Sequence, residues 1–505
     1  MITEALFLLS FLILLPLAFM MPFVGALAYE WLQYMPPYDI YHADGMSNFS
    51  LIMGGVALIG FAARDKKLMP APMGLLAVFI VYAIWLNITQ LVSIVPNDGG
   101  HNLWDRSYKM LIFTIALSLM ARTQQRIEAF IWVVCLSVGN FVVMGAIKTI
   151  LSGGGGETVV GAAGNILGER VSFAIAITSL IPLIRYLHDH ATLTERTRKV
   201  RIALNGLTVC CVLATVGSQA RTGVICLAVL GGFYFVKSKN KLAFVLTLPV
   251  LAGLVYAVAP EGYFDRMNTI QSHDDGSSLG RIDSWKWGWQ FALDHPITGG
   301  GYHSFLLHQT GTIDHPAYLE AHNILFETMA DHGFVGLALM LMLFIGTIIN
   351  CQTLSKRAKQ LPELAWAVNL GAMLQLAMWT FLAGSMTLHT ATQSPPYEFA
   401  ALSLAARGIV ERRLALIPKK AINEAFLSTR AQSTVEPAST AGLAPAAAAA
   451  GLKPLAAKGL GAVTSTGLAP VVHTGLAPMV ASASPAAAPL PRPQVVSGFG
   501  RRSSL

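Results

Sequence analysis

Long uncharged apolar segments dominate the chain, and their length limits what it can fold into. A helix needs about 20 apolar residues to cross the roughly 30 Å of hydrocarbon in a bilayer. Segments of nearly that length occur at 4–26, 47–63, 72–95, 108–121, 127–149, 171–187, 202–219, 222–236, 241–259, 333–350, 365–387 and 396–410. We therefore predict an all-α polytopic membrane protein with about twelve transmembrane helices, with ten or eleven still compatible because three segments are short.

Composition supports this prediction and charge sets the orientation. Only 12% of the 505 residues are charged, against about 25% in a soluble domain. With the N-terminus inside, 21 of the 35 Lys and Arg residues lie on the cytoplasmic side, eight lie outside, and six lie in the C-terminal tail, residues 423–505. Because cytoplasmic loops are enriched in these residues, we expect both termini inside and the polar segment 260–331 outside. The net charge of +8 follows from this bias, so it implies no nucleic-acid partner.

Composition also divides the chain into a membrane domain, residues 1–422, and a tail, residues 423–505. The first four residues carry no basic n-region, so we expect the first span to stay in the membrane. The tail is rich in Ala, Pro, Gly, Ser and Thr, which predicts a disordered cytoplasmic extension. All five cysteines fall in or beside spans, so neither disulfides nor a metal site is predicted.

Two arginines on the predicted outer side are the clearest candidates for binding an anionic ligand. Arg221 lies between two apolar spans at the outer lipid boundary, and Arg281 opens an amphipathic stretch that contains Trp285. A guanidinium can hold two phosphate oxygens, so converging arginines would bind a lipid-linked diphosphate and offset the charge that grows on it as a leaving group. Simpler roles stay open: Arg221 could reach the lipid headgroups, and Arg281 could pair with a nearby aspartate.

His322 lies where the outer segment re-enters the membrane. An imidazole with a pKa of roughly 6.5 can take a proton from an attacking hydroxyl, and Asn323 or Glu327 could orient it. Six other histidines occur between residues 260 and 332, so spacing alone does not single out His322. These histidines show no HxxxH or HExxH pattern, so no zinc site is predicted. Gly299–Gly301 lacks the Lys-Ser/Thr of a phosphate-binding loop and predicts a turn.

In chain order these motifs resemble the O-antigen ligase and O-antigen polymerase superfamily. They are Ser218-Gln219-Ala220-Arg221, Gly280-Arg281 with Trp285, His295-Pro296, Gly299–Gly301, and Ala321-His322-Asn323 with Glu327. Further motifs are similar to O-glycosylation ligases associated with exosortase A systems: Pro22-Phe23-Val24-Gly25, Pro182-Leu183-Ile184-Arg185 and Asp265-Arg266-Met267. The resemblance covers roughly residues 20–345 and excludes the tail.

The resemblance implies a large membrane glycosyltransferase (GT-C-like) architecture with one partly helical periplasmic loop, in a bacterial inner membrane. It implies metal-independent, inverting transfer without a cofactor, from an undecaprenyl diphosphate-linked glycan to a glycan, lipid or protein acceptor, among membrane lipids. The implied catalytic residues are His322, Arg281 and Arg221. The implied substrate-binding residues are Arg266, Trp285, Asn323, Glu327 and Lys109.

Three alternatives stay open. A polysaccharide polymerase would use the same residues with a second lipid-linked glycan as acceptor. A membrane transporter would need ionisable residues near the bilayer midplane and an internal repeat, whereas the charged positions here lie at span ends. A scaffold for an export complex would depend on the tail.

Deletion of residues 423–505 is expected to leave glycan transfer in membranes unchanged, because the tail lacks the apolar residues needed to build a site. Mass spectrometry of glycoconjugates from cells with the full and the shortened chain provides the measurement. Complete loss of product from a normally inserted shortened chain would favour the scaffold.

Overall fold

The computed structural model describes residues 2–36, 48–65, 72–152, 158–161, 167–237, 241, 253, 276–312, 315–318 and 320–416. The chain divides into two units, Met1–Pro437 and Ala438–Leu505, and every described residue belongs to the first. The predicted tail, Arg266 and nearly all of the predicted span at 241–259 lie outside the described residues.

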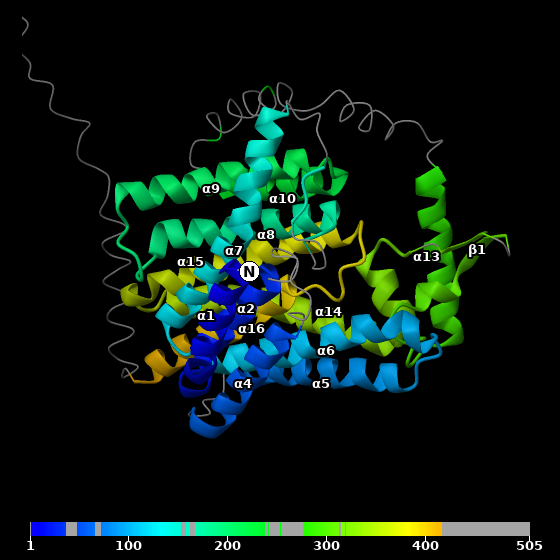
Figure 1. The fold of residues 1–505 in the computed structure, drawn as a ribbon, viewed down its shortest axis with the longest axis horizontal. Helices are drawn as coiled ribbons and strands as arrows, with labels where there is room; N and C mark the ends of the chain where they lie inside the picture. The colour runs from blue at the N-terminus through cyan, green and yellow to red at the C-terminus, as the bar shows by residue number, and fades with distance from the viewer. Residues whose placement is uncertain are drawn as a thin grey trace, which may run out of the picture. The chain divides into compact units, whose positions relative to one another are not determined.

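Helices make up almost all of the described structure (Figure 1). They are α1 (Ile2–Met20), α2 (Pro22–Tyr34), α4 (Phe49–Arg64), α5 (Met73–Leu91), α6 (Asn97–Met120), α7 (Gln124–Leu151), α8 (Arg170–His190), α9 (Arg198–Gly217), α10 (Arg221–Lys237), α13 (Gly276–Asp294), α14 (Ile324–Ala358), α15 (Ala365–Ser385) and α16 (Pro395–Ala415), with short 3-10 turns η1 (Ser304–Leu307) and η2 (Pro362–Leu364). One antiparallel hairpin, β1 (Gln309–Thr312) and β2 (His315–Tyr318), joins them.

The helical, multi-pass prediction is confirmed. Among the described residues, six helical segments are long and apolar enough to cross a membrane: α5, α7, α8, α9, α14 and Pro362–Ser385. α1 and α4 contain shorter apolar stretches. Twelve crossings and the GT-C-like architecture stay predictions.

The start of the chain differs from the predicted single span at 4–26. α1 ends at Met20, and α2 begins at Pro22, whose ring suits the first turn of a helix but not its interior. The rings of Phe7 and Trp31 lie 6.2 Å apart, whereas one continuous helix would separate them by about 36 Å. α1 and α2 therefore run side by side in opposite directions, and the single-span prediction is wrong.

This hairpin also brings the end of α1 to the end of α4. The Arg64 guanidinium lies 5.4 Å from the ring centroid of Phe19, near the end of α1. The side of the membrane on which each terminus and the 260–331 segment lie stays a prediction.

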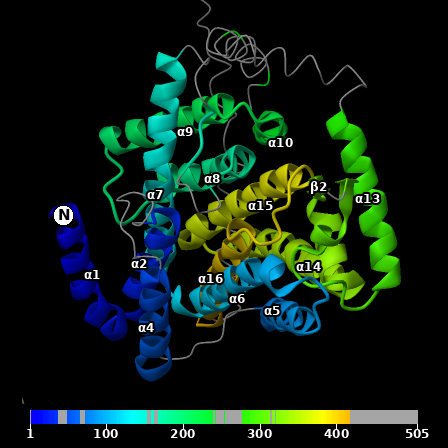
Figure 2. The same cartoon turned by 45° about the vertical axis from the view of Figure 1, so that its right-hand side comes forward.

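α8 and α15 form the centre of the main hydrophobic core. α15 packs against α8 on one side and α14 on the other, an arrangement visible in both ribbon views (Figures 1 and 2). Phe173 of α8 and Phe381 of α15 are fully buried. Hydroxyls in these helices bond to their own backbone, as those of Thr178 and Thr380 do to the carbonyls of Ala174 (2.6 Å) and Leu376 (2.9 Å), so these polar groups are satisfied within the apolar interior.

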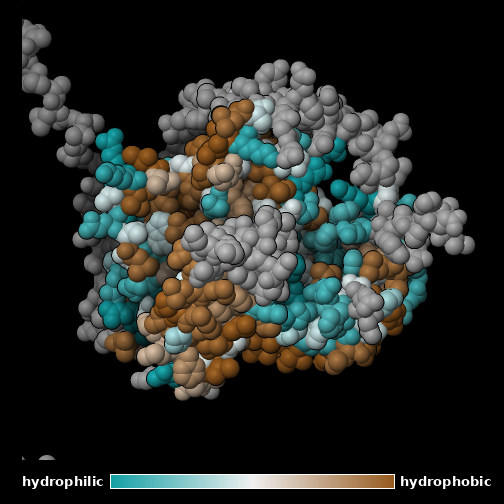
Figure 3. Space-filling model, viewed as in Figure 1, coloured by the Kyte–Doolittle hydropathy of each residue, from teal (hydrophilic) through white to brown (hydrophobic). Residues whose placement is uncertain are grey.

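The outer surface of α1 and α4 carries many large apolar side chains. Leu9 and Leu12 of α1 and Ile59 of α4 are exposed, and hydrophobic residues cover the face over these helices in Figure 3. A soluble protein rarely exposes so continuous an apolar area. This face is suited to contact with lipid.

The glycine run Gly299–Gly301 packs against a kink in α14. Gly333 has φ 69° and ψ −177° inside this helix, and Gly299 also has a positive φ of 62°. The N–H of Gly300 donates to the carbonyl of Ala330 (2.9 Å), and that of Phe334 donates to Pro296 (2.9 Å). Gly299–Gly301 is therefore a tight turn clamped onto the kink, as expected, and it connects α13 to α14.

Gly333→Ala is expected to destabilise the protein by about 1–3 kcal/mol, because a left-handed backbone strains any residue with a Cβ. The new Cβ would also lie 2.1 Å from the carbonyl oxygen of Ile297. Thermal unfolding in detergent measures the effect. The matched control is Gly231→Ala in α10, where no atom lies within 4 Å of a new Cβ. Equal unfolding temperatures for the two variants would contradict the structural role of the kink.

Candidate active site

The turn between α15 and α16, residues 386–394, connects the ends of three other helices. Its side-chain contacts are Thr387 with Thr222 of α10 (2.5 Å), Gln393 with Ser172 of α8 (2.9 Å), and Asn323, before α14, with the carbonyl of Met386 (3.3 Å). We call this segment the 386–394 turn. It brings together residues that are distant in the sequence.

Glu327 holds the centre of the 386–394 turn. Its Oε2 accepts hydrogen bonds from the backbone N–H groups of Thr390 (2.9 Å) and Ala391 (3.2 Å). Asn323 caps the same helix end, since its Oδ1 accepts from the N–H of Leu325 (2.9 Å). Both predicted substrate-binding residues are buried and bonded to the protein's own backbone. The contacts of Asn323 and Glu327 position the turn. The sequence analysis had suggested instead that one of them orients the His322 ring, and neither residue makes that contact among the described residues.

His322 lies in the segment that leads into α14, in a strained conformation. Its φ is 45°, in the left-handed region that non-glycine residues seldom adopt. The carbonyl of the preceding Ala321 accepts a hydrogen bond from Nε1 of Trp285 (2.7 Å), which fixes this segment. Nδ1 of His322 is buried and has no hydrogen-bond partner among the described residues. Such strain is characteristic of residues held for function.

The environment keeps the His322 imidazole neutral. Burial lowers the pKa of His322 below its ordinary value of 6.5. The carboxylate of Glu320 opposes this shift, and the positive charges of Arg281 and His389 add to it. At neutral pH the ring therefore has a lone pair that can accept a proton.

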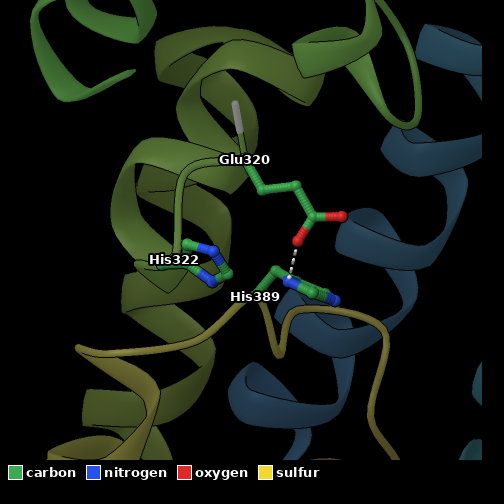
Figure 4. A group of neighbouring side chains, drawn as sticks. All are labelled: Glu320, His322 and His389. Carbon is green, nitrogen blue, oxygen red and sulfur yellow. Dashed lines mark ion pairs between the residues drawn. The ribbon is translucent and has the colours of Figure 1, made fainter. Parts of the chain in front are cut away.

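His389 faces His322 from the 386–394 turn and forms an ion pair with Glu320 (Figure 4). Its Nδ1 lies 2.9 Å from Oε2 of Glu320, and the two imidazole centroids are 6.0 Å apart. Burial works to lower the pKa of His389, but the hydrogen bond to Glu320 and the charges of Glu327 and Glu320 raise it to about 9. The same hydrogen bond lowers the pKa of Glu320 to about 2. A charged pair thus lies beside a neutral histidine.

These three side chains also have the composition of a small metal site. Glu320, His322 and His389 each offer one potential ligand atom, and these atoms lie within 4.8 Å of one another. A cation such as Zn²⁺ binds only deprotonated imidazole. The ion pair with Glu320 raises the pKa of His389, so a cation would have to displace its proton in order to bind there.

α13 brings Arg281 and Trp285 to the same place. The two residues are four positions apart, so they share one face of the helix. The Trp285 ring stacks on Phe326 of α14, with centroids 5.4 Å apart and planes 2° from parallel. Nε of Arg281 is buried without a hydrogen-bond partner among the described residues, and the charge of Arg281 acts on His322. The structure therefore brings Arg281, Trp285 and His322 together, and their roles stay predictions.

Arg221 lies at the edge of this group. It is the first residue of α10, where the helix dipole adds positive potential to the guanidinium. The next residue, Thr222, contacts Thr387, and His389 follows two positions later. An anion bound against Arg221 would therefore lie beside the 386–394 turn.

Of the other predicted substrate-binding residues, Lys109 is not part of the group, and Arg266 is not described by the structure. Lys109 pairs with Asp105 on α6 (2.5 Å) and lines a different cavity. Arg266 lies outside the described residues, so its role stays a prediction.

Sequence reasoning missed Glu320, His389 and Glu169. Glu169 caps α8 by accepting from the N–H of Ser172 (2.6 Å), and its charge acts on both His322 and His389. His389 lies between the last two predicted spans on the predicted outer side, a location that could have identified it. Glu320 precedes His322 by two positions and could have been found as its nearest acid.

Two parts of the chain match known protein families. Residues 206–341 match the family described as O-antigen ligase, and residues 2–192 match DUF5935, a family of unknown function. No curated protein matches the chain. The first match supports the O-antigen ligase superfamily, and with it a membrane glycan ligase that uses a lipid-linked glycan and an acceptor. The narrower resemblance to exosortase-associated ligases stays a prediction.

Glu320→Gln is expected to lower the pKa of His389 from about 9, because the hydrogen bond to the Glu320 carboxylate and the charge of that carboxylate, which both raise it, are lost. Diethyl pyrocarbonate modifies only neutral imidazoles, so at neutral pH His389 should resist it in the native protein and react in the variant. Peptide mass spectrometry reads the modification.

The matched control is Asp189→Asn, which removes the partner of His188 on α8 (2.7 Å) and should leave His389 protected. Equal modification of His389 in the native protein and in the Glu320 variant would contradict the ion pair.

Proposed function

We propose that this protein is a bacterial inner-membrane glycosyltransferase that moves a glycan from undecaprenyl diphosphate to an acceptor hydroxyl on the periplasmic side. The observation that carries the proposal is a neutral, strained His322 next to the Arg281 guanidinium. A base and a phosphate-binding cation are the two groups that such a transfer needs. The family match at residues 206–341 supports the same class of reaction.

His322 acts as the base in this proposal. The acceptor oxygen attacks the anomeric carbon of the donor glycan, and its proton passes to the imidazole of His322. The bond between the anomeric carbon and the diphosphate oxygen breaks, and its electron pair leaves with the diphosphate. Because attack comes from the face opposite the leaving group, the configuration at the anomeric carbon inverts.

Arg281 and Arg221 hold the diphosphate. Negative charge grows on the leaving diphosphate as its bond breaks, and a planar guanidinium can share it over two oxygens. The unfilled hydrogen-bonding capacity of Arg281 at Nε suits such a partner. Arg221 lies at the edge of the same group, where the helix dipole adds to its charge.

His389 and Glu320 tune the base. The positive charge of His389 opposes protonation of His322 in the resting site, whereas the carboxylate of Glu320 stabilises the imidazolium that forms during transfer. His389 is thus a positioning residue, held by Glu320 on one side and by the Glu327-bound backbone on the other. Both effects favour a base that is neutral before the reaction and charged after it.

A ligase and a polysaccharide polymerase share this chemistry. Product analysis separates them: longer chains on the lipid carrier indicate a polymerase, and transfer to lipid A core or protein indicates a ligase.

His322→Gln is expected to reduce transfer by about 10²–10⁴-fold because the base is lost. Arg281→Gln should reduce it by about 10²–10³-fold because stabilisation of the leaving group is lost. Membrane vesicles supplied with lipid-linked donor, assayed for product by mass spectrometry, provide the measurement.

The matched control is Arg185→Gln, which removes an exposed guanidinium near the opposite end of α8 and should transfer normally. Treatment of the vesicles with a chelator is expected to leave the native rate unchanged. Full transfer by a normally inserted His322 variant would refute the proposed base, and loss on chelation would assign the three-residue group to a metal.

A further inference from the structure

A second polar site includes residues of the 386–394 turn. It is a cavity of about 370 Å³ between α2, α4 and α6, closed by Thr392, Ser394 and Glu398. Its volume falls within the range of about 300–1,000 Å³ typical of small-ligand pockets. We call it the α2–α6 cavity.

Aromatic rings and paired hydrogen-bonding groups line the α2–α6 cavity together. Tyr29 and Phe113 pack with ring centroids 3.8 Å apart, and the half-buried Tyr108 adds a third ring. Tyr34 donates to Oε1 of Glu398 (3.0 Å) beside Ser394. A ligand that fits such a wall presents apolar C–H faces to the rings and hydroxyls to the polar groups.

The charges in the cavity nearly cancel. Lys109 is paired with Asp105. The buried carboxyl groups of Glu30 and Glu398 hydrogen-bond to each other, which requires a proton on one of them. Arg106 is exposed and lines the same space. A diphosphate needs an excess of positive charge, so this composition favours a neutral polyhydroxyl compound.

The cavity and the proposed base share one short segment of chain. Thr392 and Ser394 line the cavity, while His389 faces His322 three residues before Thr392. Between them Glu327 binds the backbone of Thr390 and Ala391. The wall of the cavity and the residue that faces the proposed base therefore belong to one turn, which is fixed at its centre by Glu327.

We infer that the α2–α6 cavity binds a neutral saccharide of the acceptor. This inference rests on the proposed function, and it assigns a role to the N-terminal part of the chain. The helices that supply most of the wall, α2, α4 and α6, fall within residues 2–192, which match a family of unknown function. That part of the chain would then select the acceptor, while residues 206–341 carry Arg221, Arg281 and His322.

Equilibrium binding to the full-length His322→Gln protein in nanodiscs tests the inference without turnover. The probe is the neutral oligosaccharide fraction released by mild acid from the surface polysaccharide of the producing strain. Tyr108→Leu is expected to weaken binding about tenfold because stacking is lost, whereas Tyr108→Phe should retain it. Gln33→Leu, which removes an amide from the wall, should weaken it by about the same factor.

The matched control is Gln352→Leu, an exposed position near the far end of α14, which should bind like the parent protein. Size-exclusion profiles and thermal unfolding check that each variant folds. Unchanged binding in folded Tyr108→Leu and Gln33→Leu proteins would overturn the inference, as would displacement of the probe by inorganic pyrophosphate. Because no turnover is measured, these outcomes are distinct from a failure of His322 as the base, which the transfer assay reports.

Discussion

The hydrogen bonds from the Thr390 and Ala391 backbone to the Glu327 carboxylate are the contact on which the site depends. They fix the 386–394 turn against the start of α14. This contact helps to position two residues of the turn. They are His389, which faces His322, and Ser394, which lines the α2–α6 cavity. A buried carboxylate that accepts two backbone N–H groups is a stiff support, because release would leave three polar groups unsatisfied.

Charge is arranged around that support so that neighbouring groups differ in protonation. The charges of Glu320 and Glu327 raise the pKa of His389, whereas partial burial and the positive charges of Arg281 and His389 lower the pKa of His322. Two histidines with ring centroids 6.0 Å apart thus have opposite states at neutral pH. When the surroundings move the pKa values of two histidines apart, one can act as a base while the other stays a cation. It also depends on α13, which supplies Arg281 and is held through Trp285.

Local patterns in the sequence predicted the helices and two residues of the candidate site, but they missed the turn between α1 and α2 and the role of His389. Apolar length predicted the helices, because a bilayer tolerates little else. Motif order selected His322 and Arg281 from many histidines and arginines. Pro22 was read inside a span, although it marks the turn between α1 and α2. His389 follows the main motifs by more than 60 residues, and nothing local links it to Glu320.

By itself, the sequence determined that this chain is a helical membrane protein with a polar segment between spans that contains histidine and arginine. The length of an apolar segment and the distribution of Lys and Arg can be counted directly along the sequence, because neither depends on how the chain folds. The tertiary structure decided that His322 is the neutral histidine, that Glu320 pairs with His389, and that Lys109 belongs to a second cavity. Those properties depend on burial and on distances between groups far apart in sequence, and only folding sets them.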